Sequence, residues 1–254
     1  FGISSIILIM KLFKLILLCL FLFSNAYANT IYELIKIPHL EIYNIKTENK
    51  LRYLYAKQPF TIGVDNNINC FNSPKQDLEK KYIIIEKNLR RYSKNFLKKI
   101  NLKYIVLCED LSISGIGTAG IPDNIMKTLI VDIKFNEKYF ERVLHHEIFH
   151  MIDETHKEKF LYKEWENFNN PEFKYAECST CSDRLGLSIL KENEGFITEY
   201  SMSTPSEDMA EVFSFLMVNK KIIENRALKD PILNKKIFLI KKNILKIHEN
   251  FNFN

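Results

Sequence analysis

The hydrophobic pattern along the chain predicts short strands interspersed with helices. Apolar residues cluster or alternate in four short segments, as they do in strands: 51–55, 60–64, 104–108 and 129–135. After Ser73-Pro74, apolar residues recur at helical spacing from Leu78 to Ile100, with lysines and arginines between them. This spacing predicts one long amphipathic helix before the third strand.

The second half of the chain has a mainly helical pattern. Asn136 is suited to cap a helix that carries most of the histidines, and Pro205 opens another that runs to about Met217. A stripe of leucines and isoleucines predicts a last helix from about Pro231 to Phe251. Glycine, proline and asparagine predict a turn and a loop in two segments: 114–120 and 165–175. Strands and helices mixed in this order predict an α+β fold.

The N-terminal segment has the features of an export signal. From Met10, two lysines precede an unbroken apolar run and a small-x-small cleavage pattern that ends at Ala28. We expect cleavage there, so that the mature chain begins at Asn29 and is secreted or periplasmic. The alternative is a retained membrane anchor, because residues 3–23 are just long enough to span a bilayer.

Residues 1–28 are therefore interpreted as upstream sequence and signal peptide, and residues 29–254 as one domain. With 254 residues, of which 46% are hydrophobic, the chain can bury a core of its own. We expect an N-terminal lobe (29–157), a C-terminal lobe (158–254) and no membrane span after signal cleavage. The net charge is slightly positive, and no basic stripe with interleaved aromatic residues indicates nucleic acid as a partner.

Four cysteines follow the signal segment: Cys70, Cys108, Cys178 and Cys181. An even number in an exported chain is compatible with two disulfides. The Cys178-x-x-Cys181 pair by itself is weak evidence for a zinc site, because a structural site needs a second pair of ligands. We favour a disulfide or free thiols there, and the sequence leaves the pairing open.

The segment His146-Glu147-Ile148-Phe149-His150 has the spacing of a metal site on a helix. Residues four apart lie roughly 40° apart around a helix, so the two imidazoles can converge on one metal ion. Glu147, rotated by roughly 100°, can reach a water on that metal and act as a general base. Imidazole ligation in this motif suits one zinc ion, which activates water for hydrolysis. His145 faces away from His146 and is not expected to be a ligand.

The third metal ligand has two candidates. His156 would complete the pattern HExxHxxDxxH, which is similar to the metzincin pattern HExxHxxGxxH, with Met202 as a possible Met-turn. The glycine that lets the metzincin helix end sharply is replaced here by Asp153, which adopts a left-handed conformation less readily.

Glu207 is the other candidate, with Glu211 one turn later on the same helical face. Glu207 could ligate zinc while Glu211 orients a ligand histidine through its free ring N–H. Tyr200, just before the helix, could donate its hydroxyl to an oxyanion. The segment Thr204-Pro205-Ser206-Glu207 is also a capping box, so that Glu207 could instead be only a helix cap.

The spacing of these residues resembles that of known metallopeptidases. Gluzincins of the group that includes anthrax lethal factor and the secreted clostridial Pro-Pro endopeptidases have HExxH, a tyrosine, a zinc-binding glutamate seven residues later and another glutamate four beyond. Tyr200, Glu207 and Glu211 hold these places here. The run from Trp165 to Tyr175, with Gly195-Phe196 and EYSMSTPSEDMAE, also resembles a bacterial family of zinc-binding metallopeptidases.

The resemblance covers about residues 100–250 and implies a zincin-like domain. In such a domain a small mixed sheet lies over the HExxH helix and the C-terminal lobe is mostly helical. The resemblance also implies the roles of the site residues: one Zn²⁺ bound by His146, His150 and Glu207, Glu147 as general base, Tyr200 on the oxyanion, and Glu211 behind a ligand histidine.

We therefore expect an exported zinc endopeptidase that acts on proteins or peptides. Zincins usually hold the substrate along a sheet edge, and we expect the segment from Lys127 to Phe135 to be that edge, with an ordinary core strand as the alternative. One alternative is a zinc hydrolase acting on another amide, such as a cell-wall peptide. The other is a non-catalytic binding protein that zinc stabilises. Glu147 and Tyr200 argue against this last alternative, because a structural zinc site needs neither.

Overall fold

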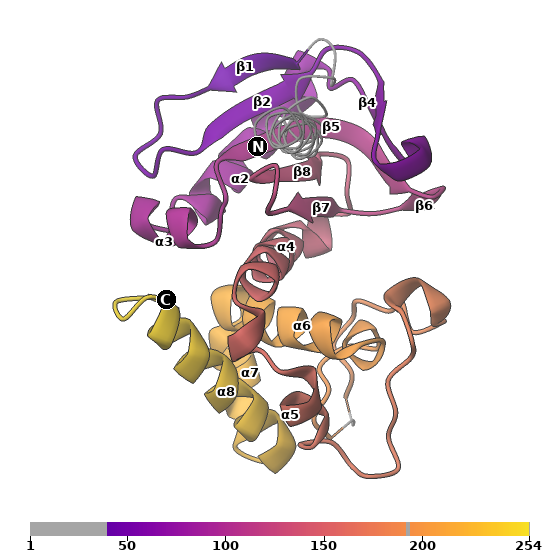
Figure 1. Ribbon diagram of the computed structural model, residues 1–254, viewed down its shortest axis with the longest axis vertical. Coiled ribbons are helices and arrows are strands. Elements are labelled where there is room, and N and C mark those ends of the chain that lie inside the picture. The colour runs from indigo at the N-terminus through magenta and orange to yellow at the C-terminus, as the bar shows by residue number, and fades with distance from the viewer. Residues whose placement is uncertain (1–39, 192–193, 254) are drawn as a thin grey trace, which may run out of the picture.

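The computed structural model describes residues 40–191 and 194–253 (Figure 1). The expected signal peptide and its cleavage site lie outside the described residues. A sheet with helices α2 (Lys75–Leu89) and α3 (Lys94–Lys99) forms one side of the molecule, and α4 (Glu137–Thr155) crosses its middle. Four further helices lie on the opposite side of α4: α5 (Tyr162–Glu166), α6 (Pro205–Val218), α7 (Lys220–Ala227) and α8 (Pro231–Ile247).

Among the described residues the sheet has eight strands and is mixed, in agreement with the predicted α+β class. Its strands are β1 (Leu40–Asn44), β2 (Arg52–Ala56), β3 (Phe60–Ile62), β4 (Ile68–Phe71), β5 (Tyr104–Ile113), β6 (Ile116–Gly117), β7 (Gly120–Asp123) and β8 (Thr128–Asp132). The first half of β5 is parallel to β2 and β8, and its second half is antiparallel to β4 and β6. The long central strand β5 therefore joins both parts of the sheet.

The prediction that the segment 127–135 lies at the edge of the sheet is wrong. The segment from Lys127 to Phe135 contains β8, which lies between β5 and β7 and is buried along its whole length. The outer strand is β7, which begins at Gly120, the last residue of the predicted glycine-rich turn. The turn itself covers only Ser114 and Gly115; β6 then pairs with β5, and β7 pairs with β8 in antiparallel register.

Two other elements differ from the sequence prediction. The helix expected to run to Ile100 ends at Leu89, and α3 begins after Ser93, whose hydroxyl accepts a hydrogen bond from the Phe96 N–H. Both pieces face the same core, so the helical spacing of apolar residues continues across the break. The segment expected to be a loop starts inside α5, where Trp165 is fully buried.

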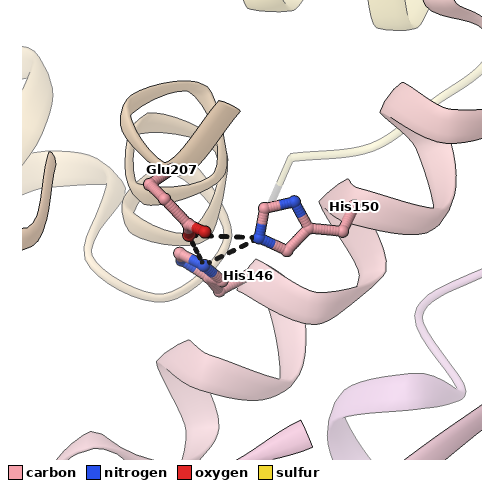
Figure 2. Close-up of side chains that lie close together, drawn as sticks. All are labelled: His146, His150 and Glu207. Carbon is pink, nitrogen blue, oxygen red and sulfur yellow. Dashed lines mark hydrogen bonds and ion pairs between the residues drawn. The ribbon is translucent and has the colours of Figure 1, made fainter. Parts of the chain in front are cut away.

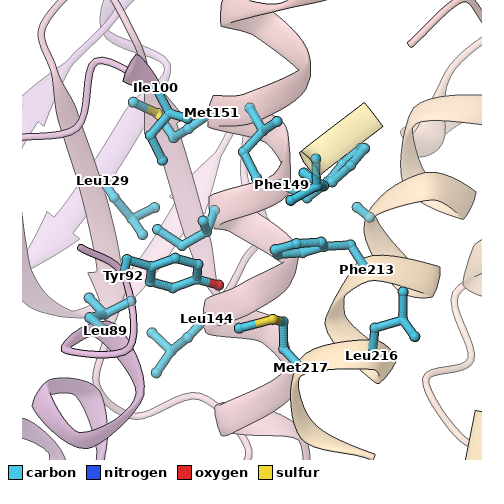
Figure 3. Close-up of a cluster of buried hydrophobic side chains, with 14 of the residues drawn as sticks. Leu89, Tyr92, Ile100, Leu129, Leu144, Phe149, Met151, Phe213, Leu216 and Met217 are labelled. Atoms are coloured by element: carbon cyan, nitrogen blue, oxygen red, sulfur yellow. The ribbon is translucent and has the colours of Figure 1, made fainter. Parts of the chain in front are cut away.

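Helix α4 lies inside the core and contacts other elements on both sides. Figure 3 shows Leu129 of the sheet near one side of α4 and Phe213 and Leu216 of α6 on the other. Phe149 stacks edge-on against Phe160 and also contacts Phe213. Asn136 caps α4 as predicted, because its side chain accepts the Lys138 N–H. The position of α4 is thus fixed from all directions.

Two disulfides are present among the described residues. Cys70–Cys108 joins β4 to β5, and Cys178–Cys181 closes a short turn in the segment between α5 and α6. The sequence left the pairing of the cysteines open. The structure pairs Cys178 with its neighbour Cys181 and links Cys70 to Cys108 across two strands. Within the described ranges, none of the helices is both long and apolar enough to span a membrane.

Candidate metal centre

Helices α4 and α6 bring His146, His150 and Glu207 together (Figure 2). The Nε2 atoms of the two histidines are 3.1 Å apart, and Oε2 of Glu207 lies 2.8 Å from His146 Nε2 and 3.2 Å from His150 Nε2. The histidines are one turn apart on α4, and Glu207 is in the first turn of α6. This group is the one cluster of potential metal ligands that the described part of the chain contains.

The start of α6 explains how Glu207 reaches the histidines. The Thr204 hydroxyl accepts the Glu207 N–H, and Pro205 occupies the first helical turn. Because Thr204 caps the helix, the Glu207 carboxylate is free to face His146 and His150. The Thr204 hydroxyl therefore provides the cap, and the Glu207 side chain contacts the histidines instead.

The second ring nitrogen of each histidine is also held. His146 Nδ1 lies 3.0 Å from Glu211 Oε1, as the sequence prediction proposes for Glu211. His150 Nδ1 lies 3.3 Å from the Ser206 hydroxyl, which donates to Asp153 Oδ2 at 2.9 Å. Acceptors at Nδ1 favour a proton on that nitrogen, so Nε2 is the ring atom of each histidine that faces Glu207 and could bind a metal.

Sequence reasoning missed the parts played by Ser206 and Asp153. Asp153 appears in the sequence as the residue that makes a metzincin turn difficult. In the structure α4 continues through Asp153, whose carboxylate accepts hydrogen bonds from Ser206 and from Tyr162. The i+3 spacing of Asp153 from His150 was the one available signal, since it puts both on one helix face.

The charges in this group compensate one another. Burial lowers the pKa of His146, but hydrogen bonds to Glu207 and Glu211 outweigh it and raise that pKa to about 10. Burial raises the pKa of Glu207, but the charge of His150 and hydrogen bonds to both histidines lower it overall. Two buried carboxylates thus hold protons on the imidazoles, and a divalent cation at the same place would replace those protons.

Glu147 lies beside the group and against the sheet. Burial raises the pKa of its carboxyl group to about 7. A Cβ atom on Gly120 would lie 2.7 Å from Glu147 Cγ, so strand β7 approaches Glu147 more closely than any side chain allows. The glycine at this position therefore allows Glu147 and the outer strand to lie side by side.

Tyr200 lies against His146. Its ring stacks on the His146 ring with centroids 5.7 Å apart, and its backbone N–H donates to the Gly186 carbonyl. Burial, together with the nearby charges of Glu207 and Glu147, raises the pKa of Tyr200. The phenol therefore stays neutral and can donate a hydrogen bond near the three potential ligands.

The donor set fits zinc. The three potential ligand atoms, two imidazole nitrogens and one carboxylate oxygen, lie within 4.8 Å of one another. Three protein ligands of these types are typical of catalytic zinc, which keeps a fourth position open. The hydrogen bonds to both Nδ1 atoms match the supporting interactions that zinc-bound histidines usually have.

The other candidate histidines lie elsewhere. His156 follows α4, and its Nε2 lies 3.1 Å from the Lys99 carbonyl oxygen. His145 points to the other side of α4, where Tyr92 and Asn88 contact its ring, so the prediction that it faces away from the metal is confirmed.

Comparison with known proteins gives a family. The family described as "Putative zinc-binding metallo-peptidase" matches residues 76–248, which is more than half of the chain. The chain belongs to this family. Among solved structures, a crystal structure of a protein with the same description from Bacteroides caccae ATCC 43185 is 18% identical, with a TM-score of 0.46 and coverage of 76% of this chain and 77% of that chain. No curated protein matches the chain.

The match of this metallopeptidase family spans the elements that form the site. Helices α4 and α6 both fall within residues 76–248, and so do β5, β7 and β8. The zinc-binding name of the family agrees with the His-His-Glu group. Strands β1 to β4, by contrast, precede the matched residues.

Proposed function

We propose that the chain is an exported zinc-dependent endopeptidase with a gluzincin-type site. The observation that carries this proposal is the convergence of His146, His150 and Glu207, with Glu147 and Tyr200 close to the group. The family name supports a metallopeptidase. The export signal before Asn29 and the likeness to the lethal factor and Pro-Pro endopeptidase group rest on the sequence.

Each residue has a distinct part in the proposed reaction. His146, His150 and Glu207 would hold a zinc ion, which would supply a Lewis acid and lower the pKa of a water molecule. Glu147 accepts a proton from that water and then delivers it to the leaving amine. The Tyr200 hydroxyl donates a hydrogen bond to the carbonyl oxygen as negative charge develops on it. Glu211 keeps His146 oriented through Nδ1.

The substrate would bind as an extended peptide along β7. Among the described strands β7 pairs with β8 alone, so its other edge is available for an added strand. The Asp132 N–H donates to the Ala119 carbonyl, which places the outward backbone groups of β7 at Gly120 and Pro122. Pro122 has no N–H, so Gly120, beside Glu147, offers the only outward donor of the two.

The test is the zinc content of the mature chain, from Asn29 onward, for the wild type, Glu207→Ala and His156→Ala. We expect near-stoichiometric zinc in the wild type and His156→Ala and its loss in Glu207→Ala, with circular dichroism to check folding. Zinc retained in Glu207→Ala and lost in His156→Ala would favour the metzincin-like alternative. A zinc-free wild type under metal-replete conditions contradicts the proposal.

Peptide-bond cleavage is then measured on a peptide library by mass spectrometry, with Glu147→Ala as the control. We expect cleavage by the wild type and a loss of several orders of magnitude in the variant, which still binds zinc. Release of products from cell-wall peptides alone would favour the other amide hydrolase, and zinc binding without hydrolysis of either substrate would favour the binding protein.

A further inference from the structure

We propose that Arg142 is a positioning residue. It holds the Glu211 carboxylate that contacts His146 Nδ1, and it links Glu211 to the segment whose backbone hydrogen-bonds to Tyr200. The inference rests on the proposed function, because it concerns the same zinc site. Arg142 is one helical turn before His146 on α4 and is only 5% exposed. A buried arginine on a central helix needs partners for all its N–H groups, and here these partners lead to the site.

One guanidinium nitrogen of Arg142 holds Glu211. Its Nη1 donates to Glu211 Oε2, and the Thr198 hydroxyl donates to the same oxygen at 2.7 Å. The other oxygen, Oε1, is left for His146 Nδ1 at 3.0 Å. Two donors from different segments fix the rotation of the carboxylate. The direction of the His146 ring is thus set by groups that do not touch the metal position.

The other guanidinium nitrogen binds the segment before α6. Arg142 Nη2 donates to the Leu187 carbonyl at 2.6 Å, and the neighbouring Gly186 carbonyl accepts the Tyr200 N–H at 3.1 Å. The guanidinium also lies over the Phe215 ring, 4.5 Å from its centroid, which holds its plane. A single side chain therefore bridges α4, α6 and the segment on which Tyr200 depends.

The two hydrogen bonds of Arg142 require the planar guanidinium group and not only a positive charge. A lysine could pair with Glu211 but cannot form the fork that reaches both Glu211 and Leu187. Loss of stability alone would not distinguish the two roles, because removal of any partner from a buried ion pair destabilises a fold. The test must therefore measure the metal itself.

The experiment is a double-mutant cycle of Arg142→Met and Glu211→Gln on the mature chain. Zinc affinity is measured by competition with a chelator, and the visible absorption of bound Co²⁺ reports ligand geometry. We expect Arg142→Met to weaken zinc binding about 10–100-fold and to shift the Co²⁺ spectrum. In the Glu211→Gln background the same change should cost less than about threefold, because Arg142 acts through Glu211.

Arg184→Met is the matched control. Arg184 also bridges backbone carbonyls of this segment, those of Met202 and Lys174, and lies over Phe173, but it does not contact the His-His-Glu group. We expect its zinc affinity to stay within about twofold of the wild type, because no ligand partner is lost. If Arg142→Met does not fold, Thr198→Val and Arg142→Lys test the inference instead. Each should weaken zinc binding by a smaller factor than the one expected for Arg142→Met.

The outcomes separate this inference from the proposed function. Zinc affinity and Co²⁺ spectrum unchanged in folded Arg142→Met, or in both substitute variants, overturn the positioning role while the metal site stands. Independent, multiplicative losses in the cycle also overturn it. A wild type that binds no zinc overturns the proposed function and the inference together.

Discussion

Gly120 is the residue at which the sheet and the proposed general base meet. Any Cβ atom there would lie 2.7 Å from Glu147 Cγ and 3.3 Å from the Ile130 carbonyl oxygen. The backbone oxygen cannot move without disturbing β8, so Glu147 has to move. In the sequence Gly120 belongs to a glycine-rich turn, and its contact with Glu147 becomes visible only when β7 and α4 are placed together.

We therefore expect Gly120→Ala to lower kcat/KM by about 10²-fold while zinc binding is retained, because Glu147 is displaced and the ligands are not. Peptide hydrolysis and zinc content are measured on the same preparation. Gly117→Ala is the matched control, since a Cβ atom on Gly117 has no neighbour within 4 Å. Equal activity of the two variants would show that Glu147 does not act from its present position.

Helix α4 is the element that relates the site to the rest of the fold. One side of it carries the ligands, and the other carries His145, which is fully buried against α2 and the residues after it. Because Asn88 Nδ2 donates to the Ile84 carbonyl, its Oδ1 faces His145 Nε2 as an acceptor, and a neutral ring with its proton on Nε2 leaves Nδ1 to accept from the Tyr92 hydroxyl. Burial lowers the pKa of His145 to about 3.

This shift predicts a pH-dependent stability. Between about pH 6.5 and 3 the unfolded chain binds a proton at His145 that the folded chain does not, so the free energy of unfolding falls as the pH falls. The slope from this group is about 1.4 kcal/mol per pH unit. Urea unfolding of metal-free protein at pH 6.5 and 4.5 should show a smaller loss in His145→Gln. Equal losses would mean that His145 is protonated in the folded state.

One lysine on α8 is buried although it lies beside the apolar stripe of that helix. Lys236 is fully buried and donates to Asp208 Oδ2 and to the Gly195 carbonyl. Asp208 also accepts from Trp165 and Tyr175, so α5, α6 and α8 are joined next to Glu207. Periodicity alone assigns a lysine beside an apolar stripe to solvent, and only the packing of three helices shows a buried ion pair.

At the scale of the molecule, the proposed metal joins its two sides. Two ligands come from α4, which packs against the sheet, and the third comes from α6 on the helical side. A bound ion therefore contributes to the stability of the whole fold, since the unfolded chain lacks the assembled site.

Removal of zinc should lower that stability. At free zinc 100-fold above its Kd, binding adds about 2.7 kcal/mol to the free energy of unfolding. Urea unfolding with buffered zinc and with excess chelator should differ by this amount in the wild type. In Glu207→Ala the difference should almost vanish, because one ligand is missing. A wild type that is indifferent to chelator would contradict a metal bound between α4 and α6.

Local sequence was sufficient for the parts of the site that lie within single helices. The spacing of His146 and His150, and of Glu207 and Glu211, sets which side chains share a face, and Thr204-Pro205 fixes where α6 begins. The α+β class, the Asn136 cap and α6 were predicted correctly for the same reason, since helix periodicity and capping are local properties.

Contacts between distant segments were decided only by the tertiary structure. The outer position of β7, the disulfide between β4 and β5, and the hydrogen bonds of Arg142, Ser206 and Asp153 depend on how elements pack, which local spacing does not encode. Sequence thus determined which chemical groups are available on each helix. Packing of α4 between the sheet and α6 determined which of these groups meet, because burial forces every charged or polar side chain there to find a partner.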